Sequence, residues 1–252
     1  MKRKRISKAR TLLVILFVLL SSSMRAHLPG SHSSDSFGWY MGLEGGTAFG
    51  VSTLSSFGAD KTRSGFTAGL YGGYQINQIF SVELAAKWGK LPMSARECCV
   101  DADNWLSVSG HQYVAEVLGE KGEYMSQLKG DAAWQNYAFR LHVNVLGFVP
   151  SLQDSPWRVE MTPQFSFWCS NDKVKNQVTG EAFHQYKPND LCLGYGGSMQ
   201  VSYQFQSGLS LGVFSGITFL NGDRLDGLVK KHHKNNFVWE SGMRLGWKFH
   251  KK

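Results

Sequence analysis

The side chains of this 252-residue chain that could do chemistry are charged residues recurring at alternate positions. In several strand-like stretches, glutamate, lysine and arginine recur at every second position. Side chains at every second position of a strand lie on the same face of its sheet. Opposite charges crowded on a buried face must pair, or they leave costly unsatisfied groups. We therefore expect an interior salt-bridge network and prefer it to a proton or ion path. Its predicted members are Glu44, Glu83, Lys87, Arg140, Arg158, Glu160, Glu240 and Arg244, with Lys248 on the same face.

Histidine is the other residue type that could act as a base or a metal ligand. His142 falls on the same predicted interior face, and the run His142-Val-Asn144 carries no serine that could act as a nucleophile. A hydrogen-bonded interior imidazole is therefore preferred to a catalytic one. No Cys-x-x-Cys or His-x-x-x-His spacing occurs, so we predict no metal site, no cofactor and no enzyme activity. The remaining candidates, His111, His184 and His232-His233, fall in predicted loops; for the last pair a solvated basic loop is preferred to anion or metal binding.

The elements that must position these residues are β-strands. Eight stretches alternate apolar residues with small or polar ones at a period of two, over lengths that can cross a membrane. In the first stretch Met41 and Leu43 lie on the apolar face, whereas Glu44 lies on the other. The count is even, as a single-chain bacterial barrel requires. The stretches are 37–49, 66–75, 80–88, 136–145, 157–167, 193–205, 209–219 and 237–249.

The connections between the stretches distinguish a membrane barrel from a soluble sandwich. Short links at 75–78 and 206–208 alternate with long ones at 50–64, 89–133, 169–190 and 221–236. Aromatic residues also gather at both ends of the apolar stripes, as interfacial girdles do. The sequence therefore predicts an all-β protein: an eight-stranded antiparallel transmembrane β-barrel with short periplasmic turns and long extracellular loops.

The basic surplus of the chain sits at its N-terminal end. Seven of the 27 lysine and arginine residues precede the first acidic residue, Asp35, and the remaining 20 nearly balance the 19 acidic ones. A cationic segment, Met1–Arg10, is followed by the apolar run Thr11–Leu20, which is too short for a membrane helix. This plan is typical of a cleaved signal peptide, and the near-neutral body argues against nucleic-acid binding. We expect a signal peptide at 1–26, a short segment at 27–36, the barrel at 37–249 and a tail at 250–252.

Five segments carry a likeness to a known family: Tyr40-Met-Gly-Leu-Glu-Gly-Gly46, Gly69-Leu-Tyr-Gly-Gly-Tyr-Gln75, Phe80-Ser-Val-Glu-Leu84, Leu209-Ser-Leu-Gly-Val213 and Gly242-Met-Arg-Leu-Gly-Trp-Lys-Phe249. They resemble the Bacteroidetes-type outer-membrane β-barrel family, a relative of the small OmpX and OmpA barrels. The likeness covers residues 37–249, and the tail His250-Lys-Lys252 departs from it. It implies a location in the outer membrane of a Gram-negative bacterium, among outer-membrane lipid and lipopolysaccharide, after insertion by the barrel assembly machinery.

The longest predicted loop, 89–133, is too long for a plain hairpin connection, and such loops usually carry function or structure of their own. It contains Trp105 and the amphipathic stretch His111–Leu118, which is compatible with a short helix. Its apolar residues would either form a surface for an extracellular partner or pack into a cap over the barrel mouth. The sequence favours neither alternative.

Four cysteines in an exported chain point to disulfide bonding. Cys169 follows the outer end of the fifth stretch and Cys192 precedes the sixth, so antiparallel pairing brings these two ends together. We predict a Cys169–Cys192 disulfide. Cys98 and Cys99 are then left to form a vicinal disulfide, stay free or pair between molecules.

These observations predict a non-enzymatic, monomeric outer-membrane barrel that supports the envelope or presents its loops to a surface partner. One alternative is an outer-membrane enzyme that modifies lipid. The other is a narrow conduit for small solutes.

Overall fold

The computed structural model describes residues 38–101, 104–109, 111–183, 190–222, 225–226, 228 and 236–249. The predicted signal peptide at 1–26, the segment at 27–36 and the tail at 250–252 lie outside the described residues. His184 and the pair His232-His233 also lie outside them.

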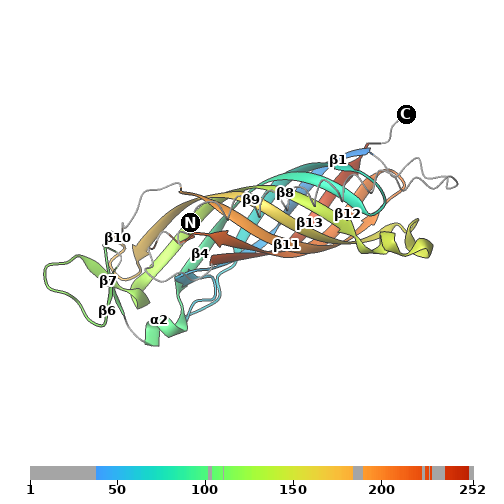
Figure 1. Cartoon of the computed structure of the whole chain (residues 1–252). Helices are drawn as coiled ribbons and strands as arrows, with labels where there is room; N and C mark the ends of the chain where they lie inside the picture. Colours follow the sequence, from blue (N-terminus) through green and yellow to red (C-terminus); the bar gives the residue numbers. More distant parts are fainter. Residues whose placement is uncertain are drawn as a thin grey trace, which may run out of the picture. The chain divides into compact units, whose positions relative to one another are not determined.

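Eight long strands of the described residues form a closed antiparallel ring (Figure 1). Each strand pairs with its sequence neighbour along the ring, and β1 pairs with both β3 and β13, which closes the ring. The predicted eight-stranded antiparallel barrel is confirmed. The strands are β1 (Gly38–Val51), β3 (Gly65–Gln75), β4 (Phe80–Ala95), β8 (Leu128–Asn144), β9 (Trp157–Asn176), β11 (Asp190–Gln204), β12 (Leu209–Asn221) and β13 (Asn236–Lys248).

The period-two pattern of the sequence sorts side chains between the two faces of the barrel wall. On β4, for example, Leu84 is 68% exposed on the outer face while its neighbour Glu83 is only 2% exposed on the inner face. Exposed aromatics mark both ends of the outer apolar band, with Trp39 and Trp157 toward the short turns and Trp88 and Phe167 toward the long loops. Among the described residues, no helix is long and apolar enough to cross a membrane.

Three strands run further than the predicted stretches 80–88, 136–145 and 157–167. At the long-loop end, β4 continues to Ala95, β8 begins at Leu128 and β9 continues to Asn176. Along this added length the alternation reverses its polarity: the side chains of Lys90 and Lys173 are exposed, whereas Leu91 and Val174 are buried. The prediction required an apolar outer face and so stopped where the outer face becomes polar. The loops predicted at 89–133 and 169–190 are correspondingly shorter.

The segment between β4 and β8 forms small elements of its own, gathered beyond one end of the long strands (Figure 1). A helix, α2, covers Glu97–Asp101, and a three-stranded sheet joins β5 (Trp105–Ser107), β6 (Gln112–Tyr113) and β7 (Gly122–Tyr124). The stretch 111–118, which is compatible with a short helix, does not form one: its start pairs as β6, and its apolar residues Val114 and Leu118 are 87% and 101% exposed.

The remaining elements are short. Strand β2 (Leu54–Ser55) pairs with β1 and β4, and β10 (Ala182–Phe183) pairs with β9. Single-turn 3₁₀ helices cover Met125–Gln127, Val145–Phe148 and Pro150–Leu152. The connections between β3 and β4 and between β11 and β12 are short, as predicted.

Candidate functional site

The centre of the barrel holds a cluster of buried charges from strands β1, β4, β8 and β13. Arg140 on β8 donates to both carboxylate oxygens of Glu44 at 2.8 Å and to Glu83 at 2.9 Å. Arg244 on β13 donates to the second oxygen of Glu83 at 2.6 Å, and its Nε lies 3.3 Å from Glu44. Two arginines and two glutamates therefore form one alternating ring of charges inside the lumen. Pairing of this kind is what makes such burial tolerable.

Lys87 and Glu240 extend the cluster toward the long-loop end. The Lys87 ammonium donates to Glu240 and lies 4.0 Å from Glu44. The other Glu240 oxygen accepts a hydrogen bond from Thr67 on β3 at 2.9 Å. Each carboxylate oxygen of Glu240 thus has a partner from a different strand.

His142 connects the cluster to a second acidic residue near the short-turn end. Its Nε2 lies 3.2 Å from Glu83 and its Nδ1 lies 3.5 Å from Glu160. Arg158 reaches Glu160 at 3.9 Å. All eight charged residues predicted for the interior therefore belong to one chain of contacts, and His142 joins it as an interior imidazole beside glutamate. We call this set, Glu44, Glu83, Lys87, Arg140, His142, Arg158, Glu160, Glu240 and Arg244, the interior network.

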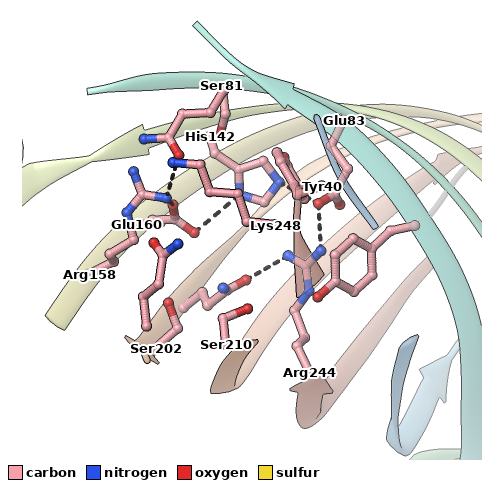
Figure 2. A pocket seen from close by; sticks show the side chains of 14 residues that line it. Tyr40, Ser81, Glu83, His142, Arg158, Glu160, Ser202, Ser210, Arg244 and Lys248 are labelled. Carbon is pink, nitrogen blue, oxygen red and sulfur yellow. Dashed lines mark hydrogen bonds and ion pairs between the residues drawn. The ribbon is translucent and has the colours of Figure 1, made fainter. Parts of the chain in front are cut away.

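A polar cavity of about 50 Å³ lies beside the network (Figure 2). Figure 2 shows side chains from opposite walls pointing into it, among them Glu83, Glu160 and Arg244. Its polar lining includes Ser202 and Ser210 as well as these charged groups. A space of this size and polarity suits a few ordered water molecules.

Side chains leave even less free volume in the middle of the lumen than beside the network. A second cavity, lined by Glu44, Lys87, Arg140, Glu240 and Arg244, measures about 10 Å³, which is at the lower limit for a single water molecule. Eight-stranded barrels have an interior just wide enough for side chains to fill it. Among the described residues, the interior network therefore fills this part of the cross-section.

Two tyrosines on the inner face depend on glycines of the neighbouring strand. Tyr71 lies opposite Gly42, and a Cβ added to Gly42 would stand 2.4 Å from the Tyr71 hydroxyl. Tyr40 lies opposite Gly73 in the same way, with a corresponding distance of 2.5 Å. The space that the glycines leave lets the Tyr71 ring carry the Arg244 guanidinium 3.8 Å from its centroid, a cation–π contact.

An apolar core, which we call the outer plug, fills the long-loop end of the interior. Trp134 and Trp168 stack there with ring centroids 4.4 Å apart, and both are buried. A cap over the barrel mouth was one of the two alternatives for loop 89–133, and Leu106 and Met125 of that loop belong to the plug. The plug residues on the strands were not predicted, because an apolar outer face was the criterion for a strand. The signal that could have found them is the reversed alternation beyond residues 88, 136 and 167. Members of the plug include Ala48, Leu54, Leu91, Met93, Leu106, Met125, Leu128, Trp134, Trp168, Val174, Phe183, Leu220, Leu225, Leu228 and Val238.

The first long loop contains an internal ion pair, Asp60–Arg63, that hydrogen-bonds to Ser94 on β4. Arg63 donates to both carboxylate oxygens of Asp60, at 2.7 and 2.5 Å, and to the Ser94 hydroxyl at 2.6 Å. These hydrogen bonds from the Arg63 guanidinium hold the pKa of the Asp60 carboxyl well below its usual range. The loop between β1 and β3 is therefore ordered by a charged contact that depends on an ionised Asp60.

The predicted Cys169–Cys192 disulfide is not formed: both residues are free cysteines. The strand register explains why. Cys169 lies opposite Leu191, which is exposed on the outer face, whereas Cys192 lies opposite Trp168, which is buried inside. The two thiols thus belong to opposite faces of the wall, and sharing a strand end does not bring them together.

Cys98 and Cys99 are also free, with their sulfur atoms 4.0 Å apart on α2. Burial raises the pKa of the Cys99 thiol, and the neighbouring Cys98 adds to that effect. No group of three or more metal-ligating side chains occurs among the described residues.

One contact bears on catalysis. The Thr162 hydroxyl lies 3.0 Å from Nδ1 of His142, so a hydroxyl, an imidazole and a carboxylate lie in sequence. A nucleophile must also meet a substrate. Thr162 is 2% exposed and does not line the 50 Å³ cavity, which could not hold an acyl chain. The arrangement therefore works as hydrogen bonding within the network.

Part of the chain is similar to a known family, and its fold is similar to solved outer-membrane proteins. Residues 34–127 match the family model described as the OmpA-like transmembrane domain. Neisserial surface protein A shares 13% identity and a TM-score of 0.43 over 84% of this chain and 97% of that one. Ail of Yersinia pestis shares 10% identity and a TM-score of 0.42 over 83% and 99%. A major outer membrane protein of Thermus thermophilus shares 11% identity and a TM-score of 0.46 over 84% and 99%. No curated protein matches the chain.

Proposed function

We propose that this chain, an outer-membrane β-barrel similar to the OmpA-like transmembrane domain, acts without catalysis as a closed scaffold that presents its extracellular loops to a surface partner. The barrel holds the loops in place, and the loops make the contact. The observation that carries the proposal is the contrast between a lumen filled by the interior network and an exposed apolar loop surface.

The side chains that fill the lumen argue against the conduit. The interior network fills the middle of the barrel and leaves a cavity of about 10 Å³, and the outer plug covers the long-loop end. Small solutes need a continuous wet path, as in the much wider porins. We expect the purified protein to give no stable single-channel openings in planar bilayers. Regular openings would support the conduit instead.

The loop surface is where a partner could gain binding energy. Val114 and Leu118 project from the loop around β6, at 87% and 101% exposure, while Trp105 and Leu106 of the same segment are buried. The loop thus combines the two alternatives, a cap over the barrel mouth and an exposed surface. Leu106 packs into the outer plug, whereas Val114 and Leu118 stay exposed. Exposed apolar patches mark interaction sites on protein surfaces, and Val114 and Leu118 would form the centre of such a patch on this loop.

A loop replacement tests the proposal. Ser94 and Lys129 are register partners, so an Asn-Gly turn joining Ala95 to Leu128 should close the β4–β8 hairpin while removing the loop. A gentler variant, Val114→Ser with Leu118→Ser, keeps the loop fold. We expect chemical cross-linking on intact cells to recover a partner with the wild-type protein and to lose it with both variants. Equal recovery with all three would contradict the proposal.

The enzyme alternative has its own measurement. A lipid-modifying activity would change the mass spectrum of lipid A between a deletion strain and its parent. We expect identical spectra.

A further inference from the structure

The two adjacent cysteines of α2 hold their sulfur atoms close together. Both are free, and the Sγ atoms of Cys98 and Cys99 lie 4.0 Å apart. Cys98 is exposed, whereas Cys99 is half-buried and packs against the outer plug. One thiol is therefore fixed by packing while the other is open to solvent, in the segment that joins β4 to β8 at the long-loop end.

The backbone of α2 keeps the two sulfur atoms at this separation. The Arg96 carbonyl accepts hydrogen bonds from the amides of Cys99, at 2.9 Å, and Val100, at 3.1 Å. The helix also lies beside the 3₁₀ turn Met125–Gln127. The thiols are thus mounted on ordered backbone, and an arriving ligand meets them already close together.

This backbone disfavours a disulfide between the two residues. Disulfide-bonded cysteines usually have Cα atoms about 4.4–6.8 Å apart, but a trans peptide bond holds adjacent Cα atoms at about 3.8 Å. The sulfur atoms would also have to approach from 4.0 Å to about 2.05 Å. Such a movement would distort the helix, so α2 favours two thiols.

A metal ion requires far less movement of the same atoms. Two thiolates bound to one tetrahedral Zn²⁺, at about 2.3 Å each, have their sulfur atoms about 3.8 Å apart. Cys98 and Cys99 would therefore close by only about 0.2 Å from their separation of 4.0 Å. Thiolate sulfur is a soft ligand that selects zinc-like ions, whereas Mg²⁺ and Ca²⁺ prefer oxygen.

The charge around the two thiols is compatible with a cation. Helix α2 carries Glu97 and Asp101 and no basic residue, and Arg96 precedes it. One positive and two negative charges leave the segment 96–101 with a net charge of −1 before either thiol ionises. Asp101 follows Cys98 by three residues, which places both on one face of the helix. A divalent ion bound by two thiolates adds no charge to this segment.

We propose that Cys98 and Cys99 form a dithiol site that binds a thiophilic divalent cation of the zinc and cadmium type. Binding forms two metal–sulfur bonds and releases two protons to solvent, one from each thiol. Water completes the coordination, because no group of three or more metal-ligating side chains occurs in the part of the chain that the structure describes. The bound ion is therefore exchangeable, unlike the ion of a four-ligand structural site. The site goes beyond the proposed function, since it does not involve Val114 or Leu118.

Titration of the folded protein with Cd²⁺ tests the site, in detergent and with a phosphine reductant that carries no thiol. Thiolate-bound Cd²⁺ absorbs in the ultraviolet, and free Cd²⁺ does not. The test variant is Cys98→Ser with Cys99→Ser. The matched control, Cys169→Ser with Cys192→Ser, removes the same number of thiols from residues on opposite faces of the wall. A third variant, Cys98→Ser alone, leaves the plug contact of Cys99 in place.

We expect one Cd²⁺ per chain, with the thiolate–cadmium absorption band, for the wild type and for the control. The test variant should show no band. Cys98→Ser should bind at least about tenfold more weakly, because losing a direct ligand costs no less than losing an outer-shell residue. Zn²⁺ should displace the Cd²⁺, and excess Mg²⁺ should not. Equal bands for the wild type and the test variant would overturn the proposal, as would loss of the band in the control.

A second measurement follows the thiols themselves in protein isolated from cells without reductant. Cys98 and Cys99 should react with iodoacetamide, and added Zn²⁺ should slow the reaction at these two residues. A disulfide that joins them, or that joins either to a second chain, would overturn the proposal because it consumes the ligands. The heat-modifiable band on unboiled SDS gels shows that each variant is folded. Val114→Ser with Leu118→Ser should bind Cd²⁺ as the wild type does, so this result and the partner test are distinguishable.

Discussion

Arg140 holds both carboxylate oxygens of Glu44 at 2.8 Å across the lumen of the barrel. Glu44 lies on β1 and Arg140 on β8, with β3 and β4 between them in the wall. The pair therefore ties two sides of the ring together through its interior. A charge-assisted, two-pronged contact of this kind fixes geometry as well as contributing energy.

Replacing Arg140 alone should destabilise the barrel strongly. Arg140→Met leaves Glu44 and Glu83 with too little positive charge in a buried site, which typically costs about 3–5 kcal/mol. Adding Glu44→Gln should recover part of the loss, so the double variant should cost less than the sum of the two single ones. Urea unfolding in lipid vesicles measures the three free energies. The control Lys121→Met, at an exposed position, should change the free energy of unfolding by about 0.5 kcal/mol or less.

Two glycines on neighbouring strands should respond differently to the same substitution. A Cβ at Gly42 would stand 2.2 Å from the Leu245 carbonyl oxygen and 2.4 Å from the Tyr71 hydroxyl, whereas a Cβ at Gly72 meets its nearest atom at 3.8 Å. We expect Gly42→Ala to reduce the fraction of folded protein and Gly72→Ala to leave it unchanged. The fraction of the heat-modifiable band on unboiled SDS gels reports both. Equal bands for the two variants would disagree with the strand geometry.

The outer plug should depend on its stacked tryptophans. Trp168→Ala removes a fully buried side chain and its stack on Trp134, and such truncations cost about 3–5 kcal/mol. Trp168→Phe keeps a ring and should cost less. Trp39→Ala is the control, because that side chain is 67% exposed on the outer face. The measurement is again urea unfolding, and a Trp39→Ala loss as large as that of Trp168→Ala would argue against a packed plug.

The loop between β1 and β3 should loosen in acid. The folded-state pKa of Asp60 is lowered by Arg63, so its contribution is present above the unfolded value of about 4 and is lost as pH falls through the folded pKa. Because Asp60 is half exposed, solvent screening limits the effect to about 1 kcal/mol or less. Hydrogen exchange of residues 56–64, corrected for intrinsic rates, should quicken on acidification. Asp60→Asn should exchange fast at neutral pH already, while Asp101→Asn should behave as the wild type.

The barrel could be predicted from the sequence because its outer face must be apolar over a fixed thickness. Because of that requirement, apolar residues such as Phe80, Val82 and Leu84 occupy every second position of each strand. The charged residues at the positions between them must then face the interior. Partner choice could not be predicted in the same way. Which glutamate meets Arg140 depends on strand tilt and stagger across the lumen, and the sequence does not state these.

The parts beyond the membrane were predicted less well for a physical reason. Outside the bilayer the outer face of a strand is polar, so Lys90 and Leu91 continue β4 with the stripe reversed. The cysteines were placed at the correct strand ends, but on opposite faces, because a shift of one residue moves a side chain across the wall. The amphipathic pattern at 111–118 was compatible with a helix, but its apolar residues Val114 and Leu118 have no neighbour to pack against and remain exposed.

The barrel closes only when β13 pairs with β1. β13 is synthesised after the other seven long strands that are described, yet Arg244 on β13 and Glu44 on β1 lie 3.3 Å apart. Until the final strand arrives, β1 has an open edge, and Glu44 and Glu83 lack their Arg244 partner. Contacts between such distant parts of a chain are slow to form, and unpaired edges aggregate. The nascent chain must therefore be kept unfolded through the whole of its export, and a copy cut short before residue 236 would have no closed form to reach.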